Sequence, residues 1–273
     1  MKLGPLQYLI IPAIVSCGIS VKDKPSEVSN AANETKASNE ILVSTESIAD
    51  RDSLITKEFL LGKFDYRKHE LFARVPRELS SKELYIQREA LDAFSKMHDS
   101  AALEKIELKI VSGTRNFEEQ KRIWEIKWQK ERANFQTPKE TALKILEYSS
   151  MPSTSRHHWG TDIDINSVES AYFKSEKGAA EYSWLLKNAN RFGFFQTYTS
   201  KENGRTGYSM EEWHWSYFPL AENYLDRYNE LIVSSDINGF MGCETANEID
   251  IIKNYVNGIE QKKNRTNNSK NNP

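Results

Sequence analysis

Imidazole and carboxylate side chains gather in two short segments that also contain tryptophan. The first segment, residues 155–164, surrounds a glycine, Gly160, and its ionisable side chains include His157, His158, Asp162 and Asp164. The second segment, residues 211–215, reads Glu-Glu-Trp-His-Trp. Imidazole nitrogen and carboxylate oxygen are standard zinc ligands, and a catalytic zinc usually has three protein ligands. We therefore expect the first segment to supply metal ligands and the second to supply another.

Other chemistries have little support in the 273 residues. Only two cysteines occur, Cys17 and Cys243, which excludes a disulfide scaffold and a cysteine-rich zinc site. The formal net charge is -2, so we expect no nucleic-acid partner. Neither a P-loop nor a dinucleotide-binding fingerprint is present, so we expect no nucleotide cofactor. Motifs of serine hydrolases are also missing.

The residues of the two segments, and their spacing, resemble the motifs of a known family. The pattern S-x-H-x-x-G-x-x-x-D (Ser155, His157, Gly160, Asp164), followed by E-x-W-H (Glu211, Trp213, His214), resembles the VanY-type D-alanyl-D-alanine carboxypeptidases. These are zinc peptidases of the hedgehog/DD-peptidase fold. The turn from Ser112 to Arg115, with Gln120, is similar to a third segment of that family, although Thr114 replaces its usual tyrosine. The resemblance spans roughly residues 80–220.

The resemblance implies a role for each matching residue. His157, Asp164 and His214 would bind one zinc ion. Glu211 would act as the general base that takes a proton from the attacking water, and Arg115 would bind a substrate carboxylate or polarise the scissile carbonyl. Supporting roles fall to Ser155, Gln120, Ser112 and Trp213. Asp162 departs from the small residue common in the family, and we expect it to support a ligand. We expect His158 to pack rather than bind metal.

The identity of the general base depends on the backbone between Glu211 and His214. In a regular strand, side chains alternate between faces, so Glu212 would share a face with His214 and Glu211 would not. The family assignment therefore requires an irregular backbone at this point. A perfect strand would favour Glu212 instead.

Hydrophobic periodicity predicts an α+β domain in which flanking helices cover a small antiparallel sheet. We expect helices over 81–98, 117–132, 138–148, 178–191, 219–231 and 244–258. Strands are expected over 106–111, 161–165, 194–198 and 212–217. Trp124, Ile126 and Trp128 are expected among the apolar anchors of the second helix, and its charged side chains from Lys121 to Arg132 are expected to face solvent.

The ends of the chain have a different composition from this domain. Residues 1–17 combine Lys2, an apolar stretch and Ser16 before Cys17, the plan of an export signal that ends at a lipidated cysteine. Residues 18–54 and 261–273 are polar and predict a disordered tether and a disordered tail. This leaves residues 55–260 as a single peptidase domain. We expect a protein of the bacterial cell envelope, anchored to the membrane by a lipid on Cys17.

The resemblance implies hydrolysis of peptidoglycan stem peptides, with release of the terminal D-Ala as the first choice. The same ligand set also serves L,D-carboxypeptidases, D,D-dipeptidases and stem-peptide endopeptidases. A wall-binding lipoprotein without catalysis is an alternative of another class. The motifs leave open the bond cleaved, the D or L preference, the membrane leaflet, the oligomeric state and the role of residues 221–260.

Overall fold

The computed structural model describes residues 53–260, and these belong to one compact unit. The predicted signal with Cys17, the predicted tail and all but the last two residues of the predicted tether lie outside them. Those boundaries and the lipidation therefore stay predictions. No helix of the described part is long and apolar enough to cross a membrane.

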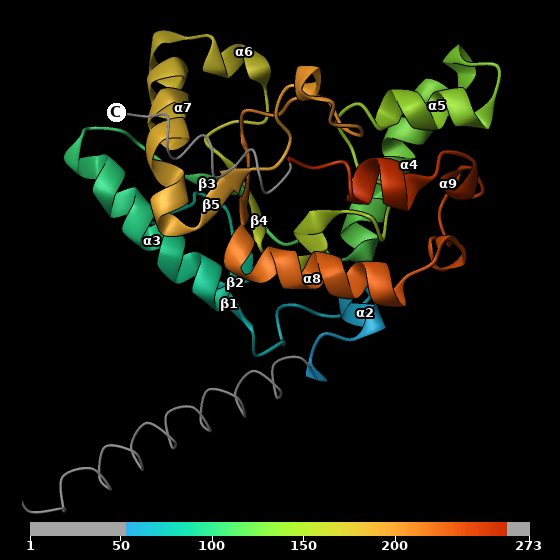
Figure 1. The fold of residues 1–273 in the computed structure, drawn as a ribbon, viewed down its shortest axis with the longest axis horizontal. Coiled ribbons are helices and arrows are strands. Elements are labelled where there is room, and N and C mark those ends of the chain that lie inside the picture. Colours follow the sequence, from blue (N-terminus) through green and yellow to red (C-terminus); the bar gives the residue numbers. More distant parts are fainter. Residues whose placement is uncertain (1–52, 261–273) are drawn as a thin grey trace, which may run out of the picture. The chain divides into compact units, whose positions relative to one another are not determined.

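A four-stranded antiparallel sheet lies at the centre of the fold (Figure 1). Its strands, in spatial order, are β3 (Ile110–Ser112), β4 (Asp162–Ile165), β6 (His214–Tyr217) and β5 (Phe194–Gln196). A second sheet pairs β1 (Phe72–Arg74) with β2 (Tyr85–Gln87), also antiparallel. The register of β4 and β6 sets Asp164 directly opposite His214.

Helices flank the sheet. They are α2 (Lys57–Leu60), α3 (Arg88–Leu103), α4 (Phe117–Glu131), α5 (Pro138–Ile145), α6 (Ser170–Phe173), α7 (Glu176–Asn188), α8 (Phe218–Leu231) and α9 (Thr245–Glu248). A short 3₁₀ turn, η2 (Arg156–Trp159), precedes β4. The predicted α+β class with small antiparallel sheets is confirmed.

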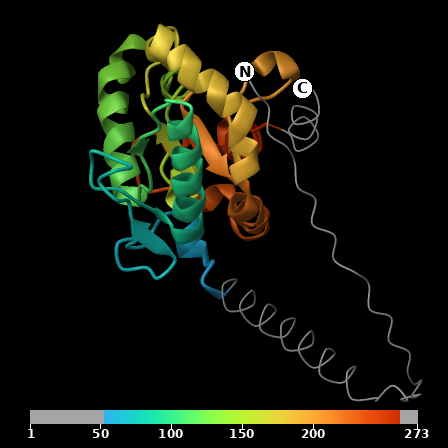
Figure 2. The ribbon, with the colours of Figure 1, turned by 90° about the vertical axis from the view of Figure 1, so that its left-hand side faces the viewer.

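The two faces of the central sheet differ in chemistry because side chains alternate along each strand. Ile163, Ile165 and Trp215 point to one face, where they pack with residues of α3 and α7 such as Phe94 and Leu185. These two helices cover that face of the sheet (Figure 2). The opposite face carries polar side chains, and all of them are buried as well. They are Asp162, Asp164, His214 and Ser216. A buried polar face requires partners for each group, which the candidate site supplies.

Helix α4 begins directly after the predicted Ser112–Arg115 turn because Asn116 caps it. The Asn116 side chain accepts a hydrogen bond from the Glu119 backbone at 2.9 Å, and the Glu119 carboxylate accepts one from the Asn116 backbone at 2.9 Å. Such a reciprocal capping box satisfies two backbone donors at a helix start. The cap therefore fixes the position of Arg115, which directly precedes the capping residue.

Several element boundaries differ from the sequence-based prediction. The strand predicted at 106–111 is paired only over Ile110–Ser112, because its neighbour β4 ends at Ile165 and Asn166 turns away at a φ of 64°. The helix predicted at 81–98 begins at Arg88, because Tyr85–Gln87 pairs with β1. The helix predicted at 244–258 is α9 followed by a π-helical turn, Ile252–Val256.

The prediction for the apolar anchors of α4 was partly wrong. Trp124 and Trp128 are buried, as expected, but Ile126 is 62% exposed. Ile126 lies two residues from each tryptophan, and this spacing rotates its side chain to the opposite side of a helix.

Candidate metal centre

Neighbouring strands bring Asp164 and His214 together. The two residues are paired in the register of β4 and β6, and their side chains lie on the same face of the sheet. The Oδ1 atom of Asp164 is 3.3 Å from Nδ1 of His214. Side chains that lie directly opposite each other on paired antiparallel strands have neighbouring Cβ atoms. The strand pairing therefore brings these two donor groups together.

The third donor comes from η2, which delivers His157 to the same place. The Nδ1 atom of His157 donates a hydrogen bond of 2.8 Å to the Gly113 carbonyl, so the ring turns its Nε2 atom toward Asp164 Oδ1 at 3.5 Å. Gly160 ends the turn in the left-handed region at a φ of 70°. A Cβ atom at Gly160 would lie 2.3 Å from the Phe72 ring, so glycine is required by conformation and by space.

The three donor atoms fit one metal ion. They lie within 4.8 Å of one another, and all three side chains are buried. Asp164 Oδ1 has no hydrogen-bond partner in the protein. Ligands about 2.0–2.1 Å from a tetrahedral zinc would be about 3.3 Å apart, close to the two distances measured here. Two imidazoles and one carboxylate suit zinc, although donor type alone does not select it among divalent ions.

The charge states of Asp164 and His157 favour cation binding. Burial disfavours the charged form of Asp164, but the two neighbouring imidazoles outweigh burial and hold the pKa of Asp164 well below its usual range. Burial, with the Arg115 charge, lowers the pKa of His157. Asp164 therefore stays ionised and His157 neutral at neutral pH, the states in which both residues bind metal.

Asp162 lies behind His214 and orients it. His214 donates from Nε2 to Asp162 Oδ1 at 3.0 Å. Arg156 donates from Nε to the same oxygen at 2.9 Å, and the hydroxyls of Thr161 and Ser216 donate to the other oxygen. Asp162 and Arg156 are both buried. A carboxylate behind a metal-binding imidazole fixes its tautomer and raises its basicity.

The backbone before β6 is irregular and brings Glu211 to the cluster. Strand β6 begins only at His214, and Glu212 and Trp213 before it form a turn. Glu211 Oε2 lies 3.6 Å from His214 Nδ1, whereas Glu212 accepts a hydrogen bond from Ser170 at 2.9 Å. Burial, reinforced by the Asp164 charge, raises the pKa of Glu211 to about 7. A buried carboxylate with this pKa can accept and return a proton near neutral pH.

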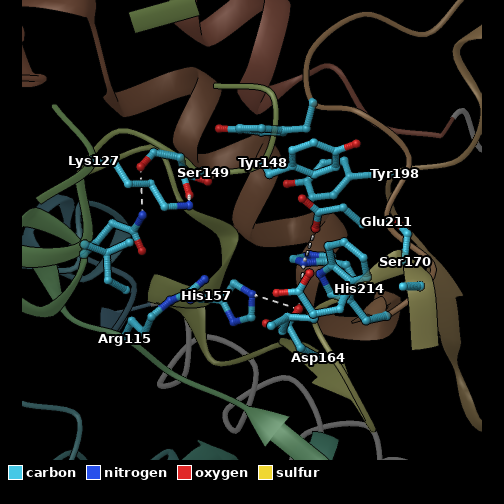
Figure 3. A pocket seen from close by; sticks show the side chains of 18 residues that line it. Arg115, Lys127, Tyr148, Ser149, His157, Asp164, Ser170, Tyr198, Glu211 and His214 are labelled. Carbon is cyan, nitrogen blue, oxygen red and sulfur yellow. Dashed lines mark hydrogen bonds and ion pairs between the residues drawn. The ribbon is translucent and has the colours of Figure 1, made fainter. Parts of the chain in front are cut away.

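A cavity of about 570 Å³ opens over the cluster (Figure 3). His157, Asp164, Glu211 and His214 line it, and so do the predicted residues Arg115, Gln120 and Trp213. The Gln120 amide donates to the Ser150 carbonyl at 2.7 Å, while its Oε1 atom is buried without a partner. The cavity thus combines metal donors, a candidate base and a guanidinium.

Three other predicted residues lie outside the cavity lining. Ser155 is buried at the start of η2, and its hydroxyl has no hydrogen-bond partner. Ser112 pairs with Asp164 in the register of β3 and β4 and is half-buried. His158 packs, as expected: its Nδ1 atom donates to the Arg115 carbonyl at 2.6 Å, and Nε2 accepts from the Ser153 backbone at 3.0 Å.

Sequence reasoning missed two features of the site. Lys127 was expected to face solvent with the other charges of its helix, but it lines the cavity. Its spacing of seven residues from Gln120 was the available signal, because residues seven apart share a helix face. Tyr198 also lines the cavity, with its ring centre 4.6 Å from that of His214, and no motif pointed to it.

Comparisons with known proteins give matches to carboxypeptidases. The family model VanY, described as D-alanyl-D-alanine carboxypeptidase, matches residues 83–220. YodJ of Bacillus subtilis is 33% identical over 137 residues, covering 49% of this chain and 46% of that protein. A D-alanyl-D-alanine carboxypeptidase of Enterococcus faecalis is 31% identical over 121 residues, covering 44% of both chains. The chain thus spans about half the length of these curated relatives.

Among solved structures, VanYB in complex with D-alanine-D-alanine is similar to this chain. The TM-score is 0.47 and the sequence identity is 24%. The match covers 60% of this chain and 85% of that one.

Proposed function

The chain belongs to the VanY D-alanyl-D-alanine carboxypeptidase family, and we propose that it is a zinc-dependent peptidase that releases the terminal D-Ala of peptidoglycan stem peptides. The observation that carries this proposal is the convergence of His157, Asp164 and His214 on one point, with the Glu211 carboxylate 3.6 Å from His214. Arg115 lines the same cavity.

In this proposal each residue has a defined task. His157, Asp164 and His214 hold the ion, which supplies Lewis acidity to the cavity when bound. Glu211 takes a proton from the attacking water onto its carboxylate and passes it to the leaving amine. Arg115 binds a substrate carboxylate or polarises the scissile carbonyl.

The test is to incubate stem peptides with the full chain and zinc and to measure products by mass spectrometry. A pentapeptide ending in D-Ala-D-Ala should lose one alanine, and a chelator or Glu211→Gln should abolish the loss. Removal of D-Ala from a tetrapeptide instead would indicate the L,D-carboxypeptidase activity, and internal cleavage the endopeptidase activity. No product from protein with bound zinc would contradict the proposal and favour wall binding without catalysis.

We also propose that the protein is exported to the bacterial cell envelope and anchored by a lipid on Cys17. Support comes from Lys2, the apolar stretch from Leu6 to Val15, and Ser16 directly before Cys17. Metabolic labelling with a radioactive fatty acid tests this. Label should enter the full chain but not its Cys17→Ala variant, and equal labelling of both would contradict the anchor.

A further inference from the structure

Lys127 extends from α4 into the cavity. Gln120, Ile123 and Lys127 follow one another at spacings of three and four residues and all line the cavity, while Trp124 and Trp128 face the core. The Lys127 side chain is half-buried, and Nζ donates to the Ser149 hydroxyl at 2.5 Å. The ammonium group is thus held at the cavity wall by a neutral partner.

Among residues 53–260, neither Lys127 nor Arg115 forms an ion pair, although other lysines of the same region do, such as Lys121 with Glu125. Arg115 Nε is also buried without a hydrogen-bond partner. Burial, with the Arg115 charge, lowers the pKa of Lys127. Glu211 and Glu169 attract the Lys127 ammonium only from beyond ion-pair distance, so both basic groups stay available to an anionic ligand that enters the cavity.

The charges of the cavity are divided between two sides. Lys127 and Arg115 lie on one side of His157, and Asp164, His214 and Glu211 lie on the other (Figure 3). A peptide whose scissile carbonyl lies at the metal donors, and whose released residue extends past His157, would place that residue beside Lys127 and Arg115. The end of that residue is a carboxylate only when the peptide is cleaved at its C-terminal bond.

We propose that Lys127 joins Arg115, whose carboxylate-binding role the family resemblance already implies, in holding the free α-carboxylate of the residue that is released. Lys127 thereby strengthens the preference of the site for a free C-terminus over a blocked one. Charge-assisted hydrogen bonds from a guanidinium and an ammonium are among the strongest that a carboxylate can accept. This inference rests on the proposed peptidase function, and it names Lys127 as a specificity-determining residue.

The test measures binding without turnover. In a Glu211→Gln background with zinc, calorimetry compares a stem pentapeptide ending in D-Ala-D-Ala with the same peptide ending in a carboxamide. The free acid should bind more tightly, and Lys127→Met should weaken its binding about tenfold or more while leaving the amide unchanged. Lys127→Arg should restore the preference for the acid.

Lys130→Met is the matched control, because Lys130 is exposed on the same helix and does not line the cavity. An equal loss of acid and amide binding in Lys127→Met would mean that Lys127 only holds the Ser149 loop, and would overturn the proposal. So would the absence of any preference for the acid. Cleavage by the unmutated chain is measured separately, so failure of the peptidase function and failure of this role of Lys127 give different results.

Discussion

His214 donates its Nε2 hydrogen to Asp162 across 3.0 Å, and this bond leaves its Nδ1 atom facing the other metal donors. This hydrogen bond belongs to a buried network in which Asp162 also accepts from Arg156, Thr161 and Ser216. Asp162 is fully buried, and burial disfavours its charge, but Arg156 and His214 outweigh burial and hold the pKa of Asp162 well below its usual range. Asp162 is therefore ionised whenever the protein is folded near neutral pH, and it fixes the tautomer that can bind metal.

Replacing Asp162 with Asn should weaken zinc binding about 10- to 100-fold, because the His214 imidazole loses the charge that raises its basicity. The same change leaves Arg156 buried without a counter-ion, so the free energy of unfolding should fall by about 3 kcal/mol. Competition with a chelating dye measures the first effect and urea unfolding the second.

A matched control exists in Asp99, an exposed aspartate that lies 3.1 Å from Nδ1 of His98. Asp99→Asn should change neither quantity. If Asp162→Asn binds zinc as tightly as the unmutated chain, then Asp162 does not orient His214 for the metal.

Glu211→Gln should reduce kcat by about 10²- to 10⁴-fold and leave the bound zinc unchanged, because the amide has the shape of the carboxylate but accepts no proton. Glu212→Gln should leave kcat unchanged, since Glu212 faces Ser170. Steady-state kinetics and metal analysis of both variants provide the measurement. The opposite pattern would make Glu212 the base.

The choice between these glutamates shows what the sequence can predict. Asp162 and Asp164 are two residues apart in a short strand, so their shared face follows from strand geometry alone. The same argument fails for Glu211, because the strand begins at His214 and the preceding residues form a turn. That turn depends on tertiary contacts, such as the bond from the Gln196 amide to the Glu211 carbonyl.

Lys127 illustrates a second limit. The helical repeat places Lys127 on the same side of α4 as Gln120, but a lysine in a charged helix is expected to face solvent. Only the packing of Trp124 and Trp128 in the core decides which side of α4 faces the cavity. The pairing of Tyr85–Gln87 with β1 was unpredictable for a similar reason, because a three-residue strand has too little periodicity to be recognised.

Zinc binding should release protons, and the number should depend on pH. In the metal-free protein, burial opposes the charge of His214, but Asp162 and Asp164 raise its pKa to about 9. His214 must lose this proton to bind metal, so about one proton should be released at pH 8, and zinc affinity should rise with pH up to about 9. Glu211 holds a proton below pH 7, and a nearby dication favours its ionised form, so a second proton should be released near pH 6.

Calorimetric titrations with zinc in two buffers of different ionisation enthalpy count these protons. Glu211→Gln should remove only the second one. A release that is absent at pH 8 would contradict the assignment of the His214 proton.

Gly160→Ala should destabilise the protein and displace His157. The left-handed conformation costs a non-glycine residue about 1–2 kcal/mol, and the new methyl group would also collide with Phe72. Gly204 separates the two costs, because its φ is 84° but nothing lies within 4 Å of a Cβ atom there. We expect urea unfolding to show a loss of about 1 kcal/mol for Gly204→Ala and about 3 kcal/mol for Gly160→Ala. Zinc affinity should fall only in the latter. Equal losses in both variants, with zinc affinity retained, would mean that the close packing at Gly160 does not position His157.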